Sequence, residues 1–70
     1  MNSNELRVEM IRNNLSTQKI AERIGISKSA MNRKLNGESE FTQGEIVKIS
    51  HELHLSTERM CDIFFVDLVS

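Results

Sequence analysis

The chain of 70 residues has no proline, tryptophan or tyrosine, one cysteine and a net charge of −1. This length makes one domain with a marginal core, and one cysteine excludes a disulfide framework and a cysteine-rich zinc site, so we expect a reducing, cytoplasmic environment. The apolar runs are too short for a membrane span or a signal peptide, and an enzyme-sized pocket is not expected in so small a domain.

A helix-start pattern recurs along the chain. An apolar residue precedes a capping Ser, Thr or Asn, and a second apolar residue follows four positions after the cap, as in a hydrophobic staple. The copies are Met1/Asn2/Leu6, Leu15/Ser16/Ile20, Ile26/Ser27/Met31, Phe41/Thr42/Ile46 and Leu55/Ser56/Met60. After Asn2 and Thr42, a glutamate three residues on can return a hydrogen bond to the cap. The pattern predicts an all-α fold, a compact bundle of about five short helices.

The expected helices cover about residues 3–13, 17–24, 28 to 35 or 36, 43–54 and 57–64. Gly25 and Gly37 should end the second and third helices, because glycine adopts the left-handed conformation of helix ends without strain. Apolar residues at helical spacing should form the core, with Val8 or Ile11 at the edge of the first stripe. The expected core comprises Leu6, Met10, Ile20, Ala21, Ile24, Ile26, Met31, Leu35, Ile46, Val47, Ile49, Leu53, Met60, Ile63 and Phe64.

The stretch from Thr17 to Asn36 has the spacing of a helix-turn-helix, with small Ala21 where the two helices cross and Gly25 in the turn. It resembles the helix-turn-helix of the lambda-repressor-like family (Cro/CI or XRE type), which includes many small phage and bacterial transcription regulators. The matching residues are Ile20, Ala21, Ile24, Gly25, Ile26 and Met31. The family usually has an aliphatic residue where this chain has Lys34. The KLNG, FTxxEIxKI and IFF stretches look like a small phage-type branch, and the resemblance extends to about Phe65.

Charge is unevenly distributed along the chain. Residues 16–37 carry five basic residues against one acid, a local charge of +4, whereas residues 38–70 carry seven acids against two basic residues, a local charge of −5. The basic segment coincides with the helix-turn-helix, where DNA phosphates would be met. The alternative is that both segments are solvated faces of opposite sign.

Five residues of the third helix fall on one polar arc of about 140° on a helical wheel. They are Lys28, Ser29, Asn32, Arg33 and Asn36, opposite Met31 and Leu35. Arg33 has the donors to bond guanine O6 and N7, and Asn32 has the groups to pair with adenine. Lys28 and Ser29 lie at the helix N-terminus, the end that enters the major groove in the family. We therefore expect Lys28, Ser29, Asn32 and Arg33 to read bases.

Phosphate contacts are implied by the resemblance for the start of the second helix and for the loop after the third. The residues are Ser16, Thr17 and Gln18 in the first group and Asn36 in the second. Lys34 lies on the flank of the third helix. Its stem can cover the edge of the core while its ammonium reaches water or a phosphate.

Two further features lie outside the helix-turn-helix. The segment from Phe64 to Ser70 is too apolar for an idle surface tail, so it folds back on the domain, pairs with a second subunit, or begins a further region. His51, His54 and Cys61 match no standard zinc spacing, and no phosphate loop, nucleophile elbow or carboxylate pair is present.

We therefore expect residues 1–70 to be a single sequence-specific DNA-binding transcriptional regulator, a repressor of a phage or mobile element that occludes a promoter. Its partner should be double-stranded DNA with a pseudo-palindromic operator, bound by a homodimer, with no cofactor, small-molecule substrate, enzymatic activity or membrane association. The alternative is a protein-interaction module, such as an antitoxin or antirepressor, whose acidic C-terminal half binds a partner protein.

Overall fold

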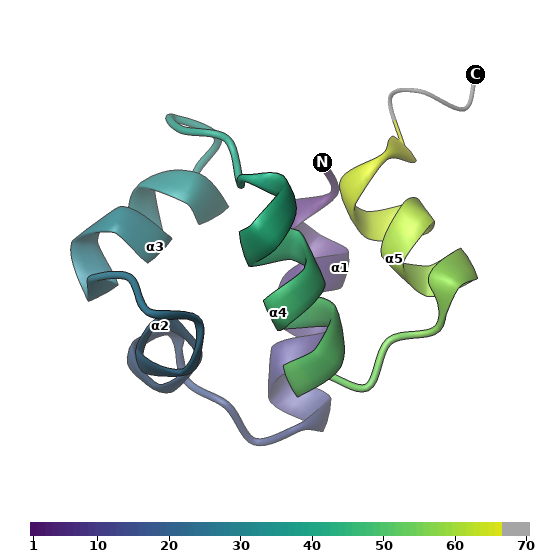
Figure 1. Ribbon diagram of the computed structural model, residues 1–70, viewed down its shortest axis with the longest axis horizontal. Coiled ribbons are helices and arrows are strands. Elements are labelled where there is room, and N and C mark those ends of the chain that lie inside the picture. The colour runs from purple at the N-terminus through teal and green to yellow at the C-terminus, as the bar shows by residue number, and fades with distance from the viewer. Residues whose placement is uncertain (67–70) are drawn as a thin grey trace.

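The computed structural model describes residues 1–66, and these residues contain five helices and no strand. The helices are α1 (Ser3–Arg12), α2 (Thr17–Ile24), α3 (Lys28–Leu35), α4 (Gln43–Glu52) and α5 (Thr57–Phe64). In Figure 1, α2 and α3 lie on one side of α4, α5 lies on the other side, and α1 runs behind α4. The predicted all-α bundle of five short helices is confirmed.

Each predicted cap begins a helix. The side chains of the five caps accept the backbone N–H three residues later at 3.0 to 3.2 Å; the caps are Asn2, Ser16, Ser27, Thr42 and Ser56. The return bond is present at Thr42, whose N–H donates to Glu45 at 2.9 Å. The predicted return bond from the Asn2 N–H to Glu5 was wrong, because packing of α1 against α5 gives this N–H a different acceptor. The Asn2 N–H donates to the Ile63 carbonyl at 2.7 Å.

The first four helices end in the same way, with a residue of positive φ. These residues are Asn14 (55°), Gly25 (83°), Gly37 (83°) and His54 (54°). In each case the next N–H bonds the carbonyl five residues back, at 2.9 or 3.0 Å: Leu15 to Met10, Ile26 to Ala21, Glu38 to Arg33, and Leu55 to Ser50. This bond satisfies a carbonyl that the helix end would otherwise leave without a donor. Helices α1 and α4 therefore end one or two residues before the predicted positions.

A matched pair of glycine substitutions tests this turn. A Cβ at Gly25 would meet no neighbouring atom, so Gly25→Ala should cost about 1 kcal/mol of unfolding free energy from the positive φ alone. Gly44 lies within α4 at ordinary φ and is equally uncrowded, so Gly44→Ala should be neutral or stabilising by up to about 1 kcal/mol. Urea unfolding followed by circular dichroism measures both. A Gly25→Ala protein as stable as Gly44→Ala would contradict the argument.

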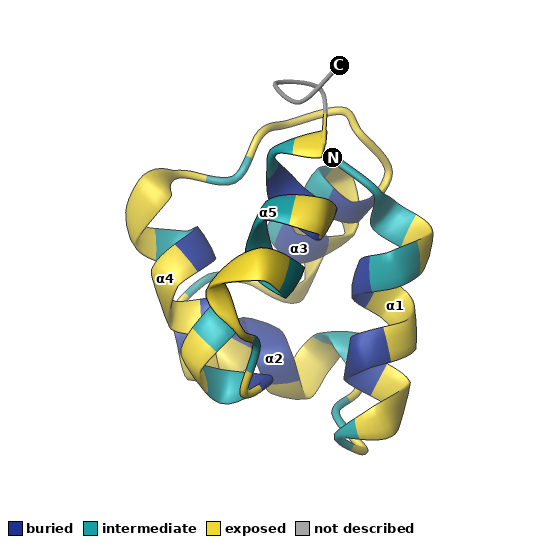
Figure 2. Ribbon diagram, turned by 90° about the vertical axis from the view of Figure 1, so that its right-hand side faces the viewer, coloured by how far each residue is buried: buried dark blue, intermediate teal, exposed yellow. Residues whose placement is uncertain are grey.

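The core contains most of the residues expected to be buried. They are Leu6, Met10, Ile20, Ala21, Ile24, Met31, Leu35, Ile46, Ile49, Leu53, Ile63 and Phe64, with Ile26 and Met60 packed half-buried against them. The expectation for Val47 was wrong, because it is 59% exposed, and Ile11 is 74% exposed. The buried stripe of α4 passes through Ile46 and Ile49 and leaves Val47 on the solvent side. Figure 2 shows the buried residues in dark blue on helices whose other residues are exposed or intermediate.

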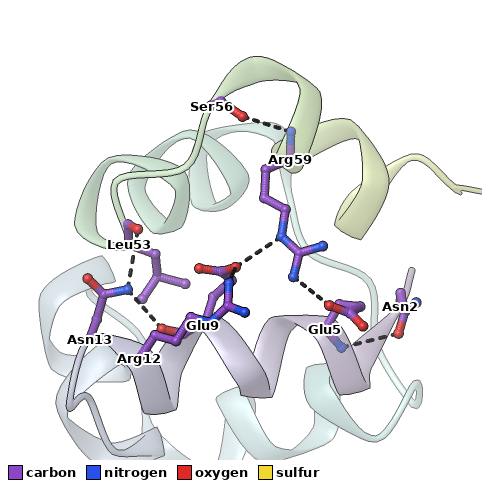
Figure 3. A network of polar contacts seen from close by, with 8 residues as sticks. All are labelled: Asn2, Glu5, Glu9, Arg12, Asn13, Leu53, Ser56 and Arg59. Atoms are coloured by element: carbon purple, nitrogen blue, oxygen red, sulfur yellow. Dashed lines mark hydrogen bonds and ion pairs between the residues drawn. The ribbon is translucent and has the colours of Figure 1, made fainter.

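An acid on α1 is buried within the bundle. Glu9 is 8% exposed and receives a hydrogen bond from Arg59 Nε of α5 at 3.0 Å, while Arg12 Nη1 lies 3.2 Å away. Arg59 also donates to Glu5, and the two carboxylates raise the pKa of Arg59 above its usual value. Figure 3 shows the guanidinium of Arg59 reaching across to α1 between these two acids. The helical pattern gave no sign of this contact, because its partners are 50 residues apart.

The start of the apolar C-terminal segment folds onto the domain. Phe64 completes α5, is 9% exposed, and meets Phe41 edge-on with ring centroids 5.6 Å apart. Phe65 is half-buried and Val66 is 40% exposed. Of the three interpretations of the tail, folding back therefore holds for Phe64 and Phe65. The part of the prediction that concerns residues 67–70 lies outside the described residues.

Candidate nucleic-acid interface

The outer face of α3 carries the four residues expected to read bases. Lys28, Ser29, Asn32 and Arg33 are all exposed. On the opposite face of the same helix, Met31 is 0% and Leu35 is 2% exposed. The buried pair fixes the rotation of α3 about its own axis, so the polar arc points away from the core.

The entry into α3 is held by local bonds. After the turn at Gly25, the Ser27 side chain accepts the Ala30 N–H at 3.0 Å. Ile20, Ala21 and Ile24 of α2 belong to the same buried cluster as Met31, so α2 backs α3 with apolar side chains. In Figure 1, α2 and α3 form the end of the molecule farthest from α5. Apolar packing against α2 thus holds α3 in place on the bundle.

Ion pairing separates the basic residues into two groups. Within residues 1–66, five of the nine Lys and Arg side chains form ion pairs with acids: Arg12, Lys19, Arg23, Lys34 and Arg59. The other four have no ion pair in that part of the chain: Arg7, Lys28, Arg33 and Lys48. Two of the four lie on the exposed arc of α3. Two acids of the C-terminal half, Glu45 and Glu52, pair with basic residues of the helix-turn-helix, while Lys28 and Arg33 keep their charge on the α3 face.

Lys34 is held by the fold. Its ammonium lies 3.0 Å from the Glu45 carboxylate, donates to the Glu40 carbonyl at 2.9 Å, and lies 5.7 Å from the centre of the Phe41 ring. The Lys34 side chain is 12% exposed. The structure therefore favours the packing role over the phosphate contact that the sequence left open. Lysine at this position therefore leaves no buried charge unpaired.

The Lys34–Glu45 pair predicts a pH-dependent contribution to stability. Desolvation raises the pKa of Glu45, but the bond from the Thr42 N–H and the Lys34 ammonium outweigh it, so the pKa lies below its ordinary value of 4.5. Since the folded pKa is the lower one, the contribution is complete above pH 4.5 and is lost as the pH falls through the folded pKa. Glu45→Gln should therefore lower Tm at neutral pH, and the difference from the parent should shrink in acid.

Thermal unfolding followed by circular dichroism at several pH values measures that difference. Glu22→Gln is the matched control, because Glu22 is 58% exposed and lies 3.8 Å from Lys19. We expect a near-zero difference for the control at every pH. A deficit in Glu45→Gln that stays constant into acid would mean that the charge pair is not its cause.

The expected phosphate-contacting residues lie at two helix ends. Ser16 caps α2, accepts the Lys19 N–H at 3.1 Å and is exposed, as is Gln18, while Thr17 is half-buried. Asn36 caps the C-terminus of α3 and is exposed.

Arg7 of α1 lies next to both groups and was not among the predicted contact residues. Its Nη2 lies 3.5 Å from Asn36 Oδ1, and it lines a shallow groove with Ser16 and Thr17. The one available signal was that residue 7 directly follows the buried Leu6 and so falls outside the core stripe.

The described residues offer no cluster of metal ligands and no membrane-spanning helix. Within residues 1–66, no group of three or more His, Cys, Asp or Glu side chains is placed to hold a metal ion. His54 has an evident structural role, since its positive φ ends the turn after α4. No helix in the described part of the chain is long and apolar enough to cross a membrane.

Comparison with protein families identifies the domain. The family model for the Cro/C1-type helix-turn-helix DNA-binding domain matches residues 5–64. The chain belongs to this family. The match spans all of α2 and α3. No curated protein and no solved structure gives a significant match.

Proposed function

We propose that this Cro/C1-type domain is a sequence-specific transcriptional regulator that places α3 in the major groove of its operator. The observation that carries the proposal is the exposed arc of α3, where Lys28 and Arg33 have no acidic partner among residues 1–66. A helix of this size fits the major groove, where each base pair presents a distinct pattern of donors and acceptors. The family assignment supports DNA as the ligand.

The side chains of the arc have complementary roles. Arg33 offers two parallel donors to guanine O6 and N7, and Asn32 offers the donor and acceptor that adenine requires. Lys28 and Ser29, at the N-terminal end of α3, would reach the bases that this end meets first. Ser16, Thr17, Gln18 and Asn36 would hold phosphates and so fix the register of α3 on the duplex.

The proposal includes a two-fold dimer that acts as a repressor of a phage or mobile element in the cytoplasm. One α3 reaches only a few base pairs, too few to define a unique site in a genome, so two copies on a pseudo-palindrome are needed. Their α3 helices would lie about 34 Å apart, in successive major grooves. Occupancy of a promoter excludes polymerase, and this mechanism needs no cofactor or catalysis.

A second candidate function is a protein-interaction module, such as an antitoxin or antirepressor. A groove of about 520 Å³ beside α5 favours it, because its lining includes Phe41, Ile46, Phe64 and Phe65. The surplus acids of the C-terminal half lie in the same part of the chain. A partner with an apolar segment and basic flanks would fit this side.

Selection of bound duplexes from a random library tests the proposal. We expect a short, symmetric consensus, with binding that weakens steeply as salt rises because phosphate contacts release counterions. An asymmetric consensus would remove the dimer from the proposal. If micromolar protein shows no salt-sensitive duplex binding, the DNA-binding function fails and the interaction module becomes the leading candidate.

A further inference from the structure

We infer that Arg7 of α1 is a phosphate-binding residue that joins the two phosphate-contacting regions of the interface. The inference rests on the proposed DNA-binding function and extends it to a helix outside the helix-turn-helix. In this inference, the exposed Arg7 side chain binds a DNA backbone phosphate that lies between the start of α2 and the end of α3.

Arg7 lies where these two regions meet. Its guanidinium Nη2 is 3.5 Å from Asn36 Oδ1, at the C-terminus of α3. The same side chain lines a groove of about 250 Å³ at the start of α2; the groove is formed by Arg7, Met10, Ile11, Leu15, Ser16 and Thr17. One side chain of α1 thus adjoins both ends of the surface that would follow the DNA backbone.

The fold makes little use of this guanidinium. Arg7 is exposed, forms no ion pair within residues 1–66, and its bond to Asn36 is at the long limit for a hydrogen bond. Arg59, by contrast, has a structural role, because it pairs with two carboxylates of α1. A guanidinium has five N–H donors in a planar fork that matches phosphate oxygens. The N–H donors of Arg7 therefore remain available to bind a phosphate.

The local charge supports a phosphate as that ligand. Three of the four cations without an ion pair in residues 1–66 are Arg7 and the two on the α3 arc, Lys28 and Arg33. Among the described residues, none that lines the groove beside Arg7 is acidic. An approaching phosphate would therefore meet the guanidinium and neutral polar groups without a competing carboxylate.

The test is the salt dependence of binding to a fluorescein-labelled duplex of about 20 base pairs with random sequence, measured by anisotropy. Phosphate contacts do not depend on sequence, so this probe serves before an operator is known. Arg7→Ala should weaken binding about tenfold at low salt and reduce the slope of log K against log salt by about 0.9. Arg7→Lys should keep the slope, because it keeps the charge.

Lys48→Ala is the matched control, because Lys48 is the fourth cation without an ion pair in residues 1–66 and lies on α4, outside the groove. It removes the same charge and should change affinity less than about twofold. If Arg7→Ala matches Lys48→Ala while the parent binds in a salt-dependent manner, the inference is overturned and the proposed function stands. If the parent does not bind duplex, both are overturned. Arg7→Gln repeats the test should Arg7→Ala fail to fold.

Discussion

Replacing Leu6 by alanine should lower the free energy of unfolding by about 2–5 kcal/mol. Leu6 is 0% exposed and lies in the core cluster beneath α1, so the truncation removes buried apolar surface and leaves a cavity. A domain of this length has about 4–10 kcal/mol in total. The substitution should therefore remove a large part of the stability. In urea unfolding, the midpoint should move to a lower urea concentration while the dependence of the unfolding free energy on urea concentration stays the same.

Ile11→Ala provides the control on the same helix. Ile11 is 74% exposed, so its truncation should change the unfolding free energy by no more than about 0.5 kcal/mol. The two variants separate burial from helix propensity, because alanine is a good helix former at both positions. Equal losses of unfolding free energy in the two variants would contradict the orientation of α1, in which Leu6 faces the core and Ile11 faces solvent.

Arg33→Ala should cost about 1–3 kcal/mol of binding free energy for the selected operator, a factor of roughly 5 to 150. The loss should be specific, with relaxed preference at one base position in each half-site. Arg33 is exposed and has no ion pair within residues 1–66, so Tm should not change. Competition between the operator and its single-base variants measures the effect.

Arg33→Lys separates base reading from charge. Lysine keeps the positive charge but lacks the planar fork, so binding to random duplex should survive while the preference at that base position weakens. A uniform loss across all sequences in Arg33→Ala, with base preference intact, would make Arg33 a phosphate contact. The base-reading role would then fall to Lys28, Ser29 and Asn32.

The helix boundaries were predictable because they depend on neighbours in the chain. A cap bonds an N–H three residues away, and a helix-ending turn bonds a carbonyl five residues back, so both appear as short patterns in the sequence. The exposed arc of α3 followed from Met31 and Leu35 in the same way. The ends of α1 and α4 were the exceptions, because there the positive φ falls on Asn14 and His54, which lack the freedom of glycine.

Contacts between distant residues were not predictable, and they decide how the basic residues are used. Periodicity shows which positions share a stripe, but which flank of the stripe a neighbouring helix covers depends on how the helices cross. This is why Ile11 and Val47 are exposed, and why Glu9 is buried beneath Arg59.

The sequence by itself determined the five helices, the turn at Gly25 and the outward face of α3, since all of these follow from bonds and periodicity within a few residues. Only the tertiary structure decided that Lys34 pairs with Glu45 and that Arg7 stands beside Asn36. The reason is physical. A charge interacts with whatever lies within a few ångströms, and folding brings residues far apart in the chain to that distance.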